Sequence, residues 1–336
     1  MLPVVAGAGV AGANPALCGM VVTQSTTLTS DVGPCTSTGI VVGASGVTLD
    51  LGGHRVFASP DAGDEGPGIL VQGRTGVTIR NGTVQHFDAG IAIIGGSSNI
   101  IDGITAKDNI GNAFTDFGDG IFVLNSSNNR ILNSVADHNG PYDGIGLLGN
   151  SDGNLIENNR IINNTIINSR SHGGSEGTME DDGIRLESTS RTVTPDRNVV
   201  RGNQILNNGL DGIAVFPNAT DNQIMGNTIN NNGYLGNVRR GDGVHIFAGA
   251  ARTGVLGNTV RFNARHGIRI DPTPVFPPPN LQNRIQGNIA TDNGVDPGEF
   301  DSGYDLSDGN RFCDGNVWQG NQHVTWDPVT GVDCYN

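Results

Sequence analysis

The chain has 336 residues, a formal net charge of −14 and only 15% charged residues, while 52 residues are glycine. The acidic balance argues against general nucleic-acid binding, and no apolar run reaches the roughly 18 residues that indicate a membrane span. An apolar content of 36% is compatible with a folded core if the folded unit is short and repeated.

The N-terminal residues 1–13, MLPVVAGAGVAGA, are small and apolar and end in Ala-Gly-Ala. This pattern is typical of a secretory-signal remnant, with cleavage after Ala13, or of an N-terminal arm. We expect residues 14–336 to form a single domain with a cap at each end. The cysteines fall as one close pair near each end, which predicts disulfides Cys18–Cys35 and Cys313–Cys334. Disulfides indicate an oxidising setting, so we expect a secreted or extracytoplasmic protein.

A short phrase recurs along the chain, in which glycine is followed by a β-branched residue, any residue and another aliphatic residue. The phrase begins at Gly39, Gly68, Gly90, Gly120, Gly144, Gly183, Gly212, Gly243, Gly267 and Gly303. Between these phrases lie segments such as NVVRGNQILNN from Asn198, where apolar residues alternate as in β-strands. Asparagine and glycine stand where the chain must turn, because both tolerate left-handed backbone angles. Three short strands per unit build one coil, and coils stacked about 4.8 Å apart pair their strands in parallel.

These repeats resemble the right-handed parallel β-helix of the pectate-lyase-like superfamily, in particular its NosD/CASH-type repeat. The clearest matches are GIFVLNSSNNRILNSVADHN from Gly120 and GIGLLGNSDGNLIENNRI from Gly144. The resemblance implies an all-β solenoid of about ten coils, covering residues 36 to 310, within one elongated domain. It is specific for the fold and much less so for function.

Strand alternation predicts which side chains of each repeat lie on the outer surface. The first and third residues after each glycine must point into the coil, so the second and fourth point outward. We call these outward sites the second and fourth positions. In the early coils they are mainly apolar, whereas the later coils present Arg185, Glu187, Phe216, His245, Phe247, Arg269, Asp271 and Asp305. An anionic polysaccharide lying along this face is the expected partner, with the phenyl rings as stacking platforms.

Superfamily members that act on polyuronates neutralise the uronate carboxylate with a cation, and a base then removes the C5 proton. By this resemblance Arg269 or Arg185 is the expected neutralising cation. His245 is the expected base, because an ordinary histidine titrates near neutral pH. Tyr234 or Tyr142, each just upstream of a strand glycine, is the candidate proton donor. Further expected substrate contacts are Glu187, Phe216, Phe247, His266, Asp271, Asp305, Arg239 and Arg240.

Two phrases also resemble mannuronan C5-epimerases, namely NGLDGIAVF from Asn208 and RHGIRID from Arg265. The resemblance places His266 at the family's rung histidine. Arg185 and Glu187 occupy the places of the family's catalytic Asp and His, which this chain lacks. We therefore expect a polyuronate lyase or a C5-epimerase without choosing between them.

Three alternatives remain open from the residues alone. Asp271 and Asp305, placed on neighbouring coils, would suit an inverting glycoside hydrolase. A non-catalytic carbohydrate-binding or structural solenoid needs no reactive group at all. The aspartates before successive strand glycines are either ordinary Asp-Gly turns or calcium ligands, with Asp181, Asp182, Asp211 and Asp242 as the candidate set.

Overall fold

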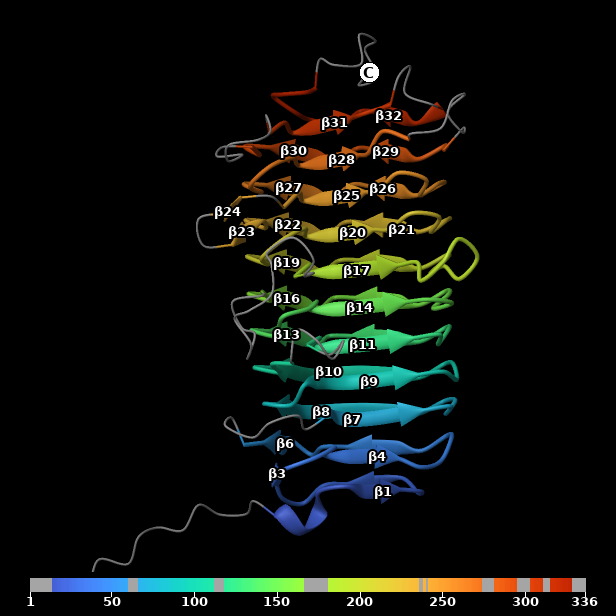
Figure 1. Cartoon of the computed structure of the whole chain (residues 1–336), viewed down its shortest axis with the longest axis vertical. Helices are drawn as coiled ribbons and strands as arrows, with labels where there is room; N and C mark the ends of the chain where they lie inside the picture. The colour runs from blue at the N-terminus through green and yellow to red at the C-terminus, as the bar shows by residue number, and fades with distance from the viewer. Residues whose placement is uncertain are drawn as a thin grey trace, which may run out of the picture.

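The computed structural model describes residues 14–59, 66–111, 118–165, 181–235, 238–239, 241–273, 281–294, 303–310 and 315–327. These residues form a stack of short parallel strands with almost no helix (Figure 1). In the described part of the chain, no helix has the length and apolar character that crossing a membrane requires. The predicted right-handed parallel β-helix is confirmed.

One sheet runs the length of the stack, and we call its outer surface the strand face. Its eleven strands lie in chain order and pair in parallel. They are β1 (Met20–Val22), β4 (Ile40–Val42), β7 (Pro67–Gln72), β9 (Ala89–Ile94), β11 (Ile121–Leu124), β14 (Ile145–Leu148), β17 (Ile184–Glu187), β20 (Ile213–Val215), β25 (Val244–Ile246), β28 (Ile268–Ile270) and β31 (Leu306–Asp308). Strand β1 adds a coil before the first repeat phrase at Gly39.

Two further faces close each coil. The second face consists of β2 (Thr26–Thr27), β5 (Thr48–Asp50), β8 (Thr78–Gln85), β10 (Ile100–Lys107), β12 (Arg130–Leu132), β15 (Leu155–Glu157), β18 (Val199–Arg201), β21 (Gln223–Met225), β26 (Gly254–Leu256), β29 (Arg284–Gln286) and β32 (Val317–Gln319). The third face consists of β3 (Val32–Cys35), β6 (Arg55–Ala58), β13 (Val135–Asp137), β16 (Arg160–Ile162), β19 (Gln204–Leu206), β22 (Thr228–Asn230), β27 (Thr259–Arg261) and β30 (Ile289–Thr291). The long strands β8 and β10 belong to both faces. An antiparallel hairpin, β23 (Tyr234–Leu235) and β24 (Val238–Arg239), leaves the stack before β25.

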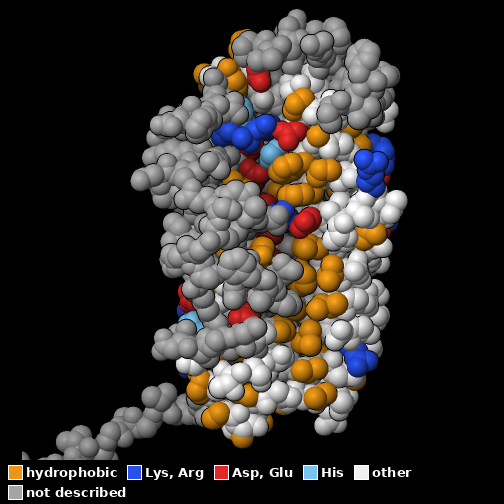
Figure 2. Space-filling view, in the orientation of Figure 1, with side chains coloured by type: hydrophobic (Ala, Val, Ile, Leu, Met, Phe, Trp, Pro, Cys, Tyr) orange, Lys and Arg blue, Asp and Glu red, His pale blue; other side chains and the backbone are white. Residues whose placement is uncertain are grey.

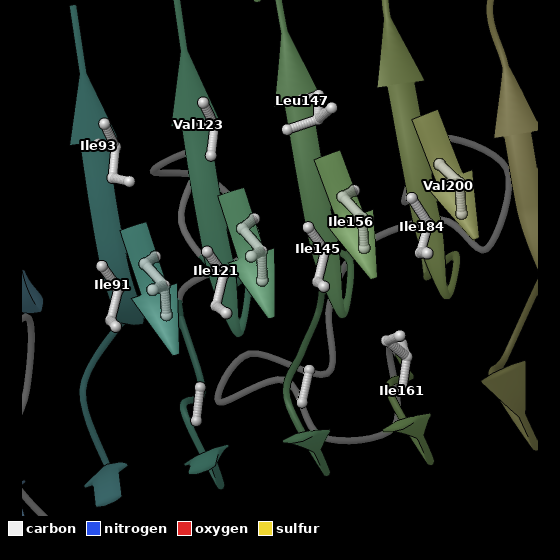
Figure 3. Close-up of a cluster of buried hydrophobic side chains, with 14 of the residues drawn as sticks. Ile91, Ile93, Ile121, Val123, Ile145, Leu147, Ile156, Ile161, Ile184 and Val200 are labelled. Carbon is white, nitrogen blue, oxygen red and sulfur yellow. The ribbon is translucent and has the colours of Figure 1, made fainter. Parts of the chain in front are cut away.

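The core is built of aliphatic columns that run along the axis. Figure 3 shows Ile91, Ile121, Ile145 and Ile184 in one column, with Ile93, Val123 and Leu147 beside them. These side chains are essentially inaccessible to solvent. Each buried aliphatic side chain stabilises the fold by about 1.5 to 3 kcal/mol, so the repeated phrase is a repeated packing unit.

Buried asparagines also stack along the axis, and we call each such column an asparagine ladder. In the ladder next to the third face, each backbone N–H donates to the Oδ1 of the asparagine one coil later. The distances are 3.2 Å from Asn164 to Asn208, 3.1 Å from Asn208 to Asn232 and 3.0 Å from Asn232 to Asn263. The side-chain amides donate within the ladder and to nearby carbonyls, so these buried polar groups are satisfied.

The glycines that begin the strands are required for close packing rather than for a turn. A Cβ on Gly212 would lie 2.5 Å from Cγ2 of Ile229 and 2.6 Å from the carbonyl oxygen of Gly243 in the next coil. Left-handed angles occur instead between the strands, for example at Gly202 and Asn207. The expectation that asparagine and glycine form those turns is confirmed.

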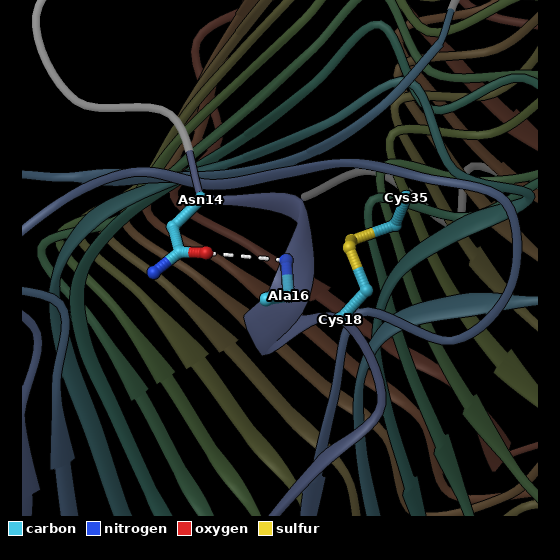
Figure 4. The surroundings of a disulfide bond; sticks show 4 residues. All are labelled: Asn14, Ala16, Cys18 and Cys35. Carbon is cyan, nitrogen blue, oxygen red and sulfur yellow. Dashed lines mark hydrogen bonds between the residues drawn. A yellow bond between two sulfur atoms is a disulfide. The ribbon is translucent and has the colours of Figure 1, made fainter.

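The N-terminal end of the stack is closed by a short 3-10 helix, η1 (Pro15–Leu17), and a disulfide. Asn14 Oδ1 accepts from the backbone N–H of Ala16, and Cys18 is bonded to Cys35 (Figure 4). The predicted Cys18–Cys35 disulfide is confirmed. The predicted Cys313–Cys334 bridge and residues 1–13 lie outside the described residues.

Candidate functional site

The strand face changes character along the axis. Over its N-terminal coils the outward positions are mainly apolar, including Leu70, Ile94, Leu124 and Leu148. From β17 onward charged side chains lie beside Phe216 and Phe247, and Figure 2 shows charged side chains among the hydrophobic ones on this face. The predicted change from apolar to charged coils is therefore present. The coil order also matches, because Arg185 pairs with Ala214, Ala214 with His245 and His245 with Arg269.

Aspartates stack at the turn that leads into the strand face, and we call Asp143, Asp182, Asp211 and Asp242 the aspartate ladder. Each Oδ1 accepts the backbone N–H of the equivalent residue one coil later. The four distances, ending at His266 N, are 3.0, 2.8, 2.6 and 2.8 Å. His266 Nδ1 then accepts the N–H of Tyr304 at 3.1 Å. This role of the Asp-Gly pairs is not apparent from the sequence alone.

His245 lies between carboxylates on both sides of its ring. Its Nδ1 is 2.8 Å from Oδ2 of Asp211, and its Nε2 is 3.2 Å from Oδ2 of Asp271, at an angle poorer than a well-aligned hydrogen bond needs. Burial would lower the histidine pKa, but the charge and hydrogen bond of Asp211, with the neighbouring Asp271, outweigh it and raise the pKa of His245 to about 10. His245 is therefore an imidazolium at neutral pH. This pKa differs from the near-neutral value expected of His245, whose role as the base stays a prediction.

Asp242 is the most buried carboxylate of this region and is surrounded by cations. Arg265 donates to both of its oxygens, and the Nη1 of Arg269 lies 3.8 Å from its Oδ2. Burial raises the pKa of Asp242, but Arg265, His266 and His245 outweigh it, so that pKa lies far below its ordinary range. Arg265 was not among the predicted residues, although it directly precedes the histidine that replaces aspartate in this coil.

Asp271 lies at the solvent edge of the same group. Its Oδ1 is 2.8 Å from Nε of Arg269, and 19% of its side chain is exposed, against 21% for Arg269. Burial raises the pKa of Asp271, but the interactions with His245 and Arg269 have a larger and opposite effect. The pKa of Asp271 therefore lies below its ordinary value, and Asp271 is a carboxylate. We call Asp211, Asp242, His245, Arg265, Arg269 and Asp271 the charged cluster.

Two phenyl rings cover the cations of the strand face. The Phe247 ring stacks on His245 at 3.7 Å between centroids, and the Arg185 guanidinium lies 3.9 Å from the centre of Phe216. The two phenyl rings also touch, at 4.5 Å. His245 and Arg185 point out of the coil as predicted, but they are only 6% and 1% exposed. The rings are thus covers over buried cations, which alternation alone could not show.

Arg185 holds neighbouring acids instead of facing solvent. Its Nε is 3.1 Å from Glu187, whose side chain is 25% exposed, and its Nη1 is 3.6 Å from Oδ2 of Asp182. Burial and the neighbouring Asp211 raise the pKa of Asp182 well above its ordinary value, while Arg185 opposes that rise. Arg185 therefore does not offer its guanidinium to a ligand in this conformation.

Asp305 is not on the strand face, which corrects the predicted register of the last coil. Strand β28 pairs Arg269 with Ser307, two residues beyond the expected position. Asp305 instead accepts from Asn293 and from the backbone of Val324 and Thr325, so it ends an asparagine ladder. The carboxylate pair proposed for an inverting hydrolase, Asp271 with Asp305, is therefore not formed as neighbours on this face.

The family model of the right-handed β-helix region matches residues 24–236 and 165–334. The chain belongs to this family. Among curated proteins, none matches the sequence significantly.

Several solved structures share the fold of this β-helix protein. The Azotobacter vinelandii mannuronan C-5 epimerase AlgE4 A-module is 14% identical, with a TM-score of 0.54 over 90% of this chain and 86% of that one. The periplasmic alginate epimerase AlgG is 13% identical, with a TM-score of 0.53 over 90% and 76%. Pectate lyase Pel9A is 13% identical, with a TM-score of 0.55 over 92% and 78%. At these identities the likeness concerns the fold.

Other predicted site residues fall around the charged cluster of this β-helix. Tyr234 begins the β23–β24 hairpin, which precedes Asp242, and its role as proton donor stays a prediction. His266 is buried in the ladder position and stacks with Tyr304 at 5.9 Å. Arg239 lies in β24, but its side chain lies outside the described part, as does all of Arg240.

The predicted calcium set does not fit this arrangement well. The groups whose ligand atoms converge within 4.8 Å are Asp211, Asp242 and His245, without Asp181 or Asp182. Calcium prefers several oxygen ligands, whereas here one ligand is an imidazole that the neighbouring carboxylates keep protonated in spite of its burial. Arg265, Arg269 and His245 already balance the charges of Asp211, Asp242 and Asp271. We therefore derive no chemistry from a metal ion.

Proposed function

We propose that this protein is a secreted, polysaccharide-active β-helix that cleaves a uronate-containing glycan by β-elimination. The fold is shared with two alginate epimerases and a pectate lyase, and the Cys18–Cys35 disulfide supports an oxidising location. The observation that carries the proposal is the arrangement of Asp271, His245 and Arg269. They combine a partly exposed carboxylate, a buried protonated imidazole and a partly exposed guanidinium on two adjacent coils.

Arg269 is the cation best placed to meet a uronate carboxylate. It is partly exposed, and its Nε now pairs with Asp271. A substrate carboxylate that takes this guanidinium acidifies the C5 proton, because the negative charge that develops after proton removal is stabilised. Asp271 at the same time loses one of the cations that lower its pKa. Substrate binding thereby strengthens Asp271 as a base.

Asp271 and His245 form a base and an acid on the same side of the substrate. Asp271 takes the C5 proton, the C4–C5 double bond forms, and the C4–O4 bond breaks. His245 gives its proton to the departing oxygen. The two side chains are 3.2 Å apart, so Asp271 returns the proton to His245 after each cleavage. The role predicted for His245 thus changes from base to acid.

Same-side chemistry favours elimination over epimerisation. An epimerase must deliver a proton to the face opposite the base, and Tyr234 is the group predicted for that task. Elimination from one side needs the C5 hydrogen and O4 on the same face of the ring. D-mannuronate and D-glucuronate units meet this condition, whereas D-galacturonate and L-guluronate units do not.

The test is a panel of these four polyuronates, with ultraviolet absorbance for unsaturated product and deuterium uptake at C5 for epimerisation. We expect absorbance with mannuronate- or glucuronate-containing polymers, and a loss of about a thousandfold in His245→Ala. The matched control is Asp119→Asn, which is away from the charged cluster. Deuterium uptake without absorbance would favour the epimerase, and neither signal with any polymer would leave a binding or structural β-helix.

A further inference from the structure

In each C-terminal ladder aspartate one oxygen serves the ladder and the other lies near a cation of the strand face, while Arg265 donates to both oxygens of Asp242. Oδ1 accepts the backbone N–H of the next coil in every case. Oδ2 faces a cation of the strand face instead. It lies 3.6 Å from Arg185 in Asp182, 2.8 Å from His245 in Asp211, and 3.8 Å from Arg269 in Asp242.

We propose that Asp211 is a positioning residue, whose Oδ1 is held by the aspartate ladder while its Oδ2 fixes the orientation and the charge of His245. Its relevance to catalysis rests on the proposed function, but its effect on His245 does not. Because Asp211 Oδ1 is held at 2.6 Å by Asp242 N, Asp211 cannot turn away without breaking a buried hydrogen bond. The backbone N–H of Asp242 therefore fixes Asp211, and Asp211 in turn fixes the direction of the imidazole ring.

Holding Nδ1 decides what Nε2 can do. A carboxylate at Nδ1 accepts its N–H, which leaves Nε2 as the atom directed to Asp271. The same carboxylate stabilises the proton on the ring. An asparagine at residue 211 could still serve the ladder through its carbonyl oxygen. Its amide would face Nδ1 with a donor, however, and would favour a neutral ring protonated on Nε2.

The charged groups that face His245 come from the start of its own strand and from two neighbouring strands. Asp211 precedes β20, Asp242 precedes β25, and Asp271 and Arg269 come from β28 and its end. Arg265 is bound to Asp242, and Phe247 covers the face of the imidazole ring. Asp211 makes the shortest contact with Nδ1, at 2.8 Å, against 3.7 Å for Asp242. Removing its charge should therefore have the largest effect among these groups.

The experiment compares wild type, Asp211→Asn and Asp119→Asn by NMR of labelled histidine side chains, without substrate. Asp119 precedes a strand glycine in the same way, but the second positions of its own coil and the next are the uncharged Phe122 and Gly146. We expect the pKa of His245 to fall by about two pH units in Asp211→Asn, with Nδ1 losing its proton first. Asp119→Asn should leave the His245 signals unchanged.

Activity assays then separate the positioning role from the reaction itself. On a polymer that wild type cleaves, Asp211→Asn should lower kcat about a hundredfold with little change in KM, and should move the basic limb of the pH profile downward. An unchanged His245 pKa in a folded Asp211→Asn protein would overturn the proposal. So would an altered pKa with unaltered kcat. If Asp211→Asn fails to fold, Asp211→Ser, which keeps one short acceptor, takes its place with the same two criteria. If no polymer is cleaved, the proposed function fails while the NMR result still decides the effect on His245.

Discussion

The asparagine ladders and the aspartate ladder solve the same backbone problem with different chemistry. Asn208 and Asp211 are three residues apart, and each accepts a backbone N–H from a neighbouring coil through one side-chain oxygen. The rest of the Asn208 side chain is a donor, which the ladder itself uses at 3.0 Å from Asn232. The rest of Asp211 is a second acceptor, which the ladder does not use. The asparagine ladder thus uses both polar atoms of the Asn208 side chain, whereas the aspartate ladder leaves one carboxylate oxygen that requires a cation beside it.

The comparison predicts that the two ladders cannot be exchanged. Asp211→Asn should fold, but Asn208→Asp should be strongly destabilised, because its new oxygen would face the Oδ1 of Asn232 and the carbonyl of Ile161. We expect a loss of about 3 to 5 kcal/mol in the free energy of unfolding at neutral pH. Urea unfolding measures it. Recovery at pH 4.5, where a buried carboxyl regains its proton, would identify charge as the cause, and equal stability to wild type would refute the distinction.

The acidic ladder should also make stability depend on pH in the alkaline range. His245 has a pKa of about 10 in the folded protein, against about 6.5 in an unfolded chain. Its contribution is therefore complete below pH 6.5 and is lost as the pH rises towards 10. Thermal melting should show this decline in wild type. In His245→Gln the decline should be smaller, and an identical decline would assign it to other groups.

A glycine between the ladders tests how closely the coils approach. Gly212→Ala would place a Cβ against Ile229 and the carbonyl of Gly243, so we expect a loss of about 1 to 3 kcal/mol. Gly226→Ala is the matched control for volume, since no neighbouring atom lies within 4 Å of a Cβ there. Its left-handed backbone adds a smaller strain. Equal losses in the two variants would show that crowding at Gly212 is unimportant.

The smallest expected effect concerns the cover over Arg185. Phe216→Leu removes the ring that lies 3.9 Å from the guanidinium, and such a contact contributes about 0.5 to 2 kcal/mol. We expect a melting temperature only slightly lower than that of wild type and tighter binding of acidic oligosaccharides, measured by calorimetry, as Arg185 becomes accessible. Weaker binding would instead make Phe216 a stacking platform, as the sequence suggested.

The fold was predictable because the same alternation of core and surface residues recurs in the sequence of each coil. Period-two alternation correctly places Ile213, Val215, Val244 and Ile246 in the core and His245 outside it. Alternation has no information on what covers an outward side chain, so the burial of His245 and Arg185 was missed. The register predicted for the last coil was wrong. The residue directly before its strand is Asp305, and not Gly303 as the repeat phrase suggested.

The role of the aspartates could not be read from the sequence for a related reason. Asp-Gly is common in tight turns, and only the three-dimensional stack shows that Oδ1 of one coil meets the N–H of the next. One signal was available: the replacement of aspartate by histidine at His266, directly after Arg265. Both residues contact Asp242 in the structure.

The closed N-terminal end gives the stack a direction of growth. Helix η1 and the Cys18–Cys35 bridge cover the first coil, and the strands of the long sheet follow one another in the order of the chain. With this end covered, the first coil has its other edge free to pair with the next coil. We therefore expect coils to be added from the capped end towards the C-terminus.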